Sequence, residues 1–100
     1  MIRGTTPTHV FQLPIDAGTL KEVRITYKQH SKVVLEKTEA DVTMEGRTIS
    51  FVLTQEESMR FESGVTVKLQ VKVLTVNGTV LASPIREFTV EDILNSEVLE

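Results

Sequence analysis

The chain has 100 residues, of which 40% are hydrophobic and 25% are charged, and its formal net charge is −3. This composition is typical of one globular domain rather than of a disordered segment. The acidic balance argues against nucleic acid or an anionic membrane as the main partner, since both attract basic surfaces. Cysteine is absent, so neither a disulfide bond nor thiolate chemistry is available.

The N-terminal residues lack the apolar run of a signal peptide, and no stretch approaches the 18 apolar residues of a membrane span. We therefore expect a chain that is complete as written, folds inside the cell and has no membrane partner.

Short segments with alternating apolar and polar residues follow one another from the start of the chain. Such alternation places one face of a strand in a core and the other in water. The pattern predicts strands at residues 8–13, 20–28, 33–35, 42–44 and 49–53. No helix of ten or more residues interrupts them, so an antiparallel sandwich or barrel is favoured over parallel βαβ units.

The sequence Thr54-Gln55-Glu56-Glu57 has the form of a helix capping box and predicts one helical turn near residues 55–60. Met59 and Phe61 would then close the open end of a sandwich. A short helical turn at this position is frequent in immunoglobulin-like domains, although the tyrosine corner and the cysteine pair of antibody domains are missing. We predict an all-β, immunoglobulin-like antiparallel β-sandwich of about seven strands at residues 1–90, followed by a helical or irregular tail at residues 91–100.

The longest alternation runs from Val65 to Val73 and is followed by Asn77-Gly78. These two residues predict a type I′ turn, because both tolerate positive φ. With a two-residue loop, Leu74 faces Leu81 across the hairpin. An apolar patch would then form on the face of the hairpin that should be exposed to solvent, with Leu74, Val76 and Leu81 as its members.

Two explanations of this patch remain open. Either the C-terminal tail covers it within the same chain, or the tail or the hairpin tip docks onto another chain, a copy of itself or a neighbour in an assembly. The tail carries four apolar residues in a segment too short for an independent helix. The candidate interface residues are Leu74, Val76, Leu81, Ile93, Leu94, Val98 and Leu99.

Catalytic, metal-ligating and cofactor-binding residues are not indicated. His9 and His30 lack the spacing of a metal site, and we expect both at the surface or the rim. No serine lies in a G-x-S-x-G elbow, and the glycines are scattered singly rather than gathered in a phosphate-binding loop. We expect a protein that is not an enzyme and needs no cofactor.

Ligand-binding surfaces are weakly marked. The chain has no tryptophan, and its one tyrosine, Tyr27, belongs to the core by its phase. Binding of carbohydrate or of single-stranded nucleic acid relies on exposed aromatic rings, so both functions are less favoured. Arg24 and Lys28 on one strand, with Lys68 and Lys72 on another, could form a basic face, but an ordinary solvated surface is the favoured interpretation.

Four segments, at residues 3–9, 53–57, 71–75 and 95–99, resemble small structural proteins encoded in phages and prophages of gut Firmicutes. The likeness covers the whole chain, and the implied sandwich is similar in outline to the N-terminal domain of phage baseplate upper proteins. The resemblance implies a non-enzymatic virion component of the tail, baseplate or head, made in the bacterial host cytoplasm. It would contact copies of itself or other phage structural proteins. The alternative is a host-surface or carbohydrate-binding β-sandwich module.

Overall fold

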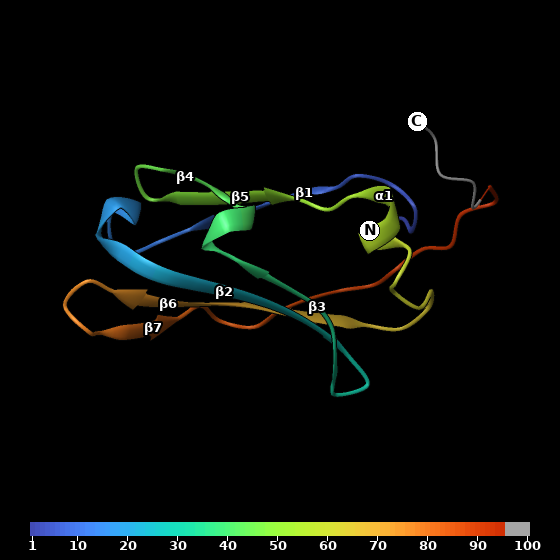
Figure 1. The fold of residues 1–100 in the computed structure, drawn as a ribbon. Helices are drawn as coiled ribbons and strands as arrows, with labels where there is room; N and C mark the ends of the chain where they lie inside the picture. Colours follow the sequence, from blue (N-terminus) through green and yellow to red (C-terminus); the bar gives the residue numbers. More distant parts are fainter. Residues whose placement is uncertain (96–100) are drawn as a thin grey trace.

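The computed structural model describes residues 1–95. Two antiparallel sheets lie face to face as two layers (Figure 1). The three-stranded sheet has the order β1-β5-β4, and the five-stranded sheet has the order β3-β2-β6-β7, with β8 also paired to β6. The strands are β1 (Thr8–Gln12), β2 (Leu20–Gln29), β3 (Lys32–Thr38), β4 (Thr43–Glu45), β5 (Thr48–Val52), β6 (Val67–Thr75), β7 (Val80–Ala82) and β8 (Arg86–Phe88).

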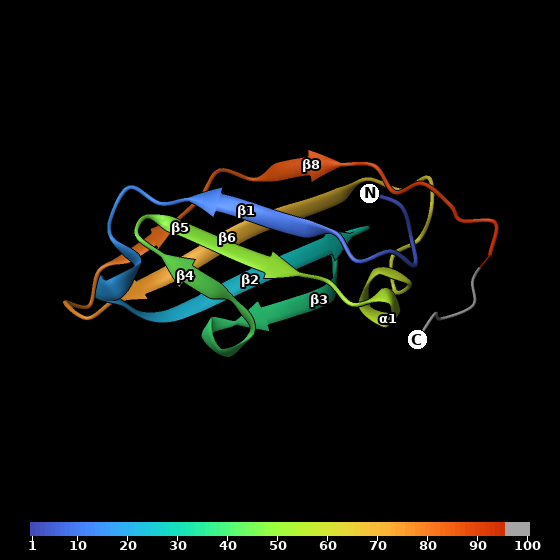
Figure 2. The same ribbon diagram turned by 90° about the horizontal axis from the view of Figure 1, so that it is seen from above.

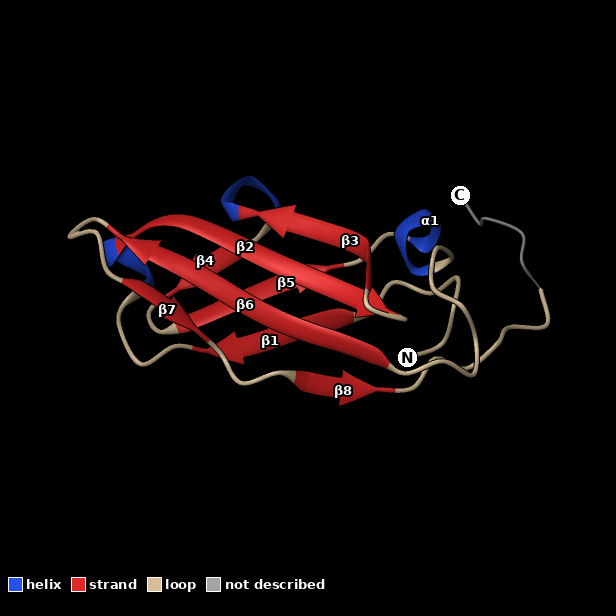
Figure 3. Ribbon diagram, turned by 90° about the horizontal axis from the view of Figure 1, so that it is seen from below, coloured by secondary structure: helices blue, strands red, loops and turns tan. Residues whose placement is uncertain are grey.

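The predicted all-β antiparallel sandwich is confirmed, with eight strands where about seven were expected. Its strand order corresponds to strands B-E-D and C′-C-F-G of an immunoglobulin-type sandwich that lacks the first strand. In this correspondence β2 and β6 are the two central strands, C and F. They cross the middle of the molecule as neighbours in the view from below (Figure 3).

The core lies between the sheets and is formed by the inward-facing positions of the alternating strands. On β2 these are Val23, Ile25 and Tyr27, each fully buried. β6 contributes Val67, Leu69, Val71 and Val73. Because side chains alternate across a strand, the intervening polar residues of β2 and β6 face solvent.

One end of the sandwich is closed by the segment between β5 and β6. The helical turn α1 (Gln55–Ser58) begins with the predicted capping box. The Thr54 hydroxyl accepts from the Glu57 N–H at 3.1 Å, and the Glu57 carboxylate accepts from the Thr54 N–H at 2.9 Å. Phe61 follows, is fully buried, and packs edge-on against Tyr27 with ring centroids 5.5 Å apart. Met59 is only partly buried.

The two ends of the described chain meet beside α1 (Figure 2). Ile2 forms a parallel bridge with Glu91. The Arg3 guanidinium donates to the carbonyls of Phe61 at 2.6 Å and Met59 at 3.0 Å, and it pairs with the Asp92 carboxylate at 3.2 Å. Arg3 therefore ties the N-terminus, the end of α1 and the residues after β8 to one another.

The hairpin between β6 and β7 differs from the prediction. Val73 pairs with Leu81 and Leu74 with Val80, one residue out of the expected register. Thr75 pairs with Thr79, and its carbonyl accepts from the Gly78 N–H at 3.0 Å. Only Gly78 of the Asn-Gly pair has positive φ. The loop thus has three residues, with glycine in the left-handed position that follows a type I turn, and the type I′ prediction is wrong.

Two further short 3₁₀ turns complete the chain, η1 (Ala17–Thr19) before β2 and η2 (Glu39–Asp41) after β3. The Val76 N–H donates to the Thr19 carbonyl at 2.9 Å, which joins the β6–β7 hairpin to η1. This bond and the pairing of β2 with β6 hold the hairpin in place at the end of the sandwich opposite α1 (Figure 1).

Candidate interaction surfaces

The change of register alters the apolar patch that the sequence predicted at the hairpin. Leu81 pairs with Val73 and packs partly buried against the core, so it does not lie with Leu74. Leu74 faces outward beside Val80, whose side chain is 55% exposed, and Val76 at the tip is 64% exposed. We call Leu74, Val76 and Val80 the hairpin patch. The sequence missed Val80 because a one-residue slip exchanges the two faces of a strand.

Residues 91–95 lie far from this patch. Residues 91–95 leave the sandwich at its α1 end, whereas the hairpin patch is at the other end (Figure 1). The Ile93 side chain lies against Gly4, and Leu94 is fully exposed. The expectation that the tail covers the patch in the same chain is therefore wrong for residues 91–95. Val98 and Leu99 lie outside the described residues.

The outer face of the five-stranded sheet brings together the four basic residues noted in the sequence. In the register of β2 and β6, Arg24 lies directly opposite Lys72, and Lys28 lies directly opposite Lys68. Like charges placed opposite each other on neighbouring strands destabilise a sheet. Arg24 is partly neutralised, since its guanidinium lies 2.8 Å from the Glu39 carboxylate. In residues 1–95, no ion pair or hydrogen bond involves the ammonium group of Lys28 or Lys68.

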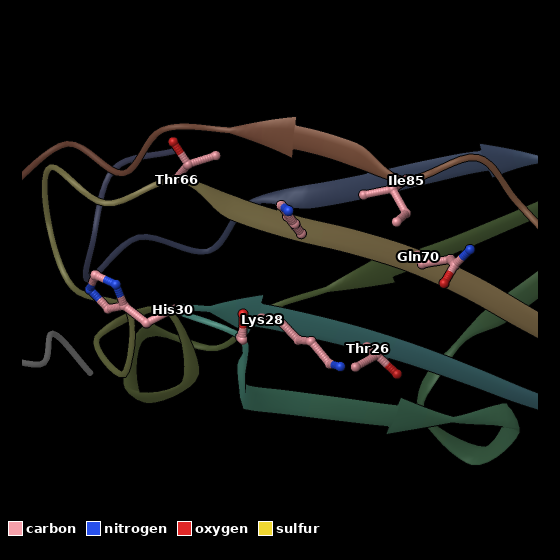
Figure 4. Close-up of a pocket in the computed structure, with 8 residues that line it drawn as sticks. Thr26, Lys28, His30, Thr66, Gln70 and Ile85 are labelled. Carbon is pink, nitrogen blue, oxygen red and sulfur yellow. The ribbon is translucent and has the colours of Figure 1, made fainter.

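Part of this face forms a shallow pocket with a volume of about 390 Å³ (Figure 4). We call it the lysine concavity; its floor and walls include Thr26, Lys28, Thr66, Lys68, Gln70 and Ile85. The turn between β2 and β3 forms its rim. No carboxylate and no aromatic ring lines it apart from the His30 imidazole at the rim. Its chemistry is that of a shallow site for an anionic group beside an apolar side chain.

Acidic residues flank the lysine concavity without lining it. On β8, Glu87 lies opposite Lys68 in the strand register. On β3, Glu36 lies opposite Thr26. At the rim, the imidazole of His30 lies 3.4 Å from the Glu62 carboxylate. Lys28 and Lys68 thus lie on the two central strands, between acidic residues on the neighbouring strands at either side.

His9, which we expected at the surface or the rim, is half-buried. Its Nδ1 atom lies 2.7 Å from the Tyr27 hydroxyl, and its ring packs near Phe51 and Phe88 with centroids 5.7 and 5.6 Å away. Burial lowers the pKa of His9, and the positive charges of the N-terminus and Arg86 lower it further. Burial also raises the pKa of the Tyr27 hydroxyl. The pair is a neutral hydrogen bond inside the sandwich.

A buried ion pair joins β3 to α1, and the sequence did not reveal it. The Lys37 ammonium lies 3.0 and 3.1 Å from the two carboxylate oxygens of Glu57. Lys37 faces inward, with its side chain only 8% exposed. Burial alone would raise the pKa of Glu57, but hydrogen bonds from Thr54 and Lys37 outweigh it and hold the pKa below its usual value. Because each charged group is neutralised by the other, we assign the pair a structural role.

Within residues 1–95, no cluster of three histidine, cysteine or acidic side chains could hold a metal ion. The same residues include no helix of the length and apolar character that a membrane span requires. Comparison with protein-family models, with curated proteins and with solved structures finds no match for this chain.

Proposed function

We propose that the protein is a non-enzymatic structural component of a phage particle, in the tail or baseplate, that acts through protein–protein contacts. The resemblance to small phage proteins supports the phage origin. The observation that carries the mode of action is the hairpin patch, where Val76 and Val80 are 64% and 55% exposed at the end of the β6–β7 hairpin. Contiguous apolar side chains on a surface favour contact with another protein.

Under this proposal the protein is made in the host cytoplasm and joins the particle during assembly. A rigid sandwich with an apolar end suits repeated contacts between copies or with a neighbour, which can close into a ring. The alternative of a carbohydrate-binding module has less support, since Tyr27 is fully buried and the lysine concavity offers no stacking platform of the kind that sugars use.

The test compares two double variants with the same chemical change. V76T/V80T alters the hairpin patch, and V10T/V52T alters two valines that are 47% and 52% exposed on the other sheet. Threonine preserves β propensity in both. Particles assembled in a host that expresses either variant are purified, and the incorporated protein is quantified by mass spectrometry.

We expect V76T/V80T to lose about tenfold or more of its incorporation, corresponding to at least about 1.4 kcal/mol of contact energy, while V10T/V52T behaves as the wild type. Absence of the wild-type protein from purified particles would refute the structural role. Equal incorporation of both variants would refute the hairpin patch as the contact.

A further inference from the structure

The acidic charge of this chain is concentrated at its C-terminal end. Residues 91–100 hold four of the fourteen acidic residues and none of the eleven basic ones. The first ninety residues are therefore left with eleven basic and ten acidic residues, and the net negative charge of the protein comes from its last ten. The same segment is apolar between its charges, with Ile93, Leu94, Val98 and Leu99.

The lysine concavity presents the complementary chemistry. Lys28 and Lys68 are direct cross-strand partners at its floor, and neither ammonium group has a carboxylate partner among the described residues. Two like charges in this arrangement repel each other, so a carboxylate placed between them removes a cost that the free protein carries. Ile85 stands beside them, 56% exposed, and offers an apolar contact.

The described part of the acidic segment, residues 91–95, and the lysine concavity lie on different sides of the molecule. Residues 91–95 leave the α1 end on the side of the three-stranded sheet, whereas the concavity is on the outer face of the five-stranded sheet (Figure 1). Arg3 and Asp92 anchor the base of the segment there, 3.2 Å apart. Leu94 then points fully into solvent. This arrangement favours a concavity on a second copy over the concavity of the same copy.

We propose that residues 91–100 of one copy bind the lysine concavity of a second copy, with Glu97 or Glu100 between Lys28 and Lys68 and a neighbouring apolar residue against Ile85. This inference rests on the proposed function and names its partner as the chain itself. The contact is head-to-tail, so the segment of each copy can bind the next copy in turn. Repetition of such a contact gives a ring or a filament rather than a closed two-fold dimer.

The test is a charge exchange in the full-length chain, followed by sedimentation velocity over a concentration series at low ionic strength. K28E/K68E reverses the concavity, E97K/E100K reverses the segment, and the fourfold variant carries both changes. K21E/R47E is the control, because it makes the same charge change as K28E/K68E at exposed residues outside the concavity.

We expect the wild type and the control to associate with increasing concentration, and added salt to weaken the association, because salt screens exposed charges. Each reversal alone should give a monomer, and the fourfold variant should associate again. Recovery in the fourfold variant is the decisive result, since impaired folding does not predict it, and the control, which has the same net charge as K28E/K68E, excludes an effect of net charge alone. Circular dichroism confirms that each variant is folded.

Three outcomes would overturn the proposal. The first is a wild type that stays monomeric at every concentration. The second is association that survives either reversal, which would assign the contact to other residues. The third is association that both single reversals abolish and the fourfold variant does not recover.

These outcomes are separable from failure of the proposed function. If the chain is monomeric but its incorporation into particles still depends on Val76 and Val80, the phage structural role stands and only the contact between copies is wrong. If wild-type particles lack the protein, the structural role fails regardless of how the isolated chain associates.

Discussion

At the scale of single residues, the burial of His9 makes the stability of the fold depend on pH. Its pKa in the folded protein is lowered from the ordinary value of 6.5. The unfolded chain therefore takes up a proton at a higher pH than the folded chain does. The stabilisation is fully present above pH 6.5 and is lost as the pH falls below that value toward the folded pKa.

We predict that the free energy of unfolding of the wild type falls between about pH 7 and about pH 5, above the range in which most carboxylates titrate. The variant H9Q should show a much flatter profile, because its amide can bond to Tyr27 but takes up no proton. Urea denaturation at several pH values measures this, with H30N as the control for removal of a histidine. An unchanged slope in H9Q would contradict the prediction.

Lys37 shows why some residue-scale features escape sequence analysis. It occupies an inward position of β3, where the alternating pattern calls for an apolar residue, so the sequence predicts a strand that ends at Leu35. The structure extends β3 to Thr38 because Glu57, twenty residues later, neutralises the lysine. A buried charge is tolerated only with such a partner, and nothing in the local sequence identifies it.

At the scale of elements, the two hairpins of the five-stranded sheet have turns that their sequences do not suggest. Asn77-Gly78 is the preferred type I′ pair, yet it lies in a three-residue loop. His30-Ser31 has no such preference, yet both residues have positive φ, 52° and 62°, between the paired Gln29 and Lys32. Burial of the flanking strands fixes the register of each hairpin and therefore the length of its loop. It outweighs the local turn propensity in both.

The strained turn at His30 and Ser31 gives a prediction about stability. Left-handed backbone costs roughly 1–2 kcal/mol for a residue with a Cβ atom, and asparagine and glycine relieve most of it. We expect H30N/S31G to gain about 1 kcal/mol, which raises the melting temperature by about 4–8 °C. Thermal denaturation measures the shift.

The single variant S31G separates the two contributions, because it keeps the contact of His30 with Glu62. A gain in S31G that is lost in the double variant would mean that this contact outweighs the backbone strain at position 30.

At the scale of the whole molecule, two arginines join parts that are distant in the sequence. Arg3 joins the N-terminal residues, the end of α1 and Asp92. Arg86 on β8 places its guanidinium 4.1 Å from the centre of the Phe11 ring and donates to the Val10 carbonyl at 3.2 Å. Arg86 thereby links the edge strands β8 and β1 of opposite sheets. It also provides a hydrogen-bond donor for the Val10 carbonyl on the exposed edge of β1.

We predict that R3M lowers the free energy of unfolding by about 2 kcal/mol, since it removes charge-assisted hydrogen bonds to two carbonyls of a partly buried segment. R60M is the matched control, because Arg60 is exposed nearby on the same segment. Urea midpoints of the two variants provide the comparison. Equal midpoints would show that the side-chain contacts of Arg3 contribute nothing to the stability of the sandwich.

The sequence by itself determined the features that depend on local periodicity. The inward faces of β2 and β6, the capping box of α1 and the burial of Phe61 all follow from residues close together in the chain. The antiparallel sandwich then follows, because short alternating strands without intervening helices have few other ways to bury one face.

Only the tertiary structure decided which strands are neighbours and in which register. That choice turned Leu81 inward and left Leu74 and Val80 outside, and it placed Lys28 opposite Lys68. The physical reason is that a slip of one residue exchanges the two faces of a strand, and burial of the whole core selects between the registers. The outward positions of Lys28, Lys68 and Leu74 already follow from the alternation, but which residues lie opposite them across the sheet was known only once the register was selected.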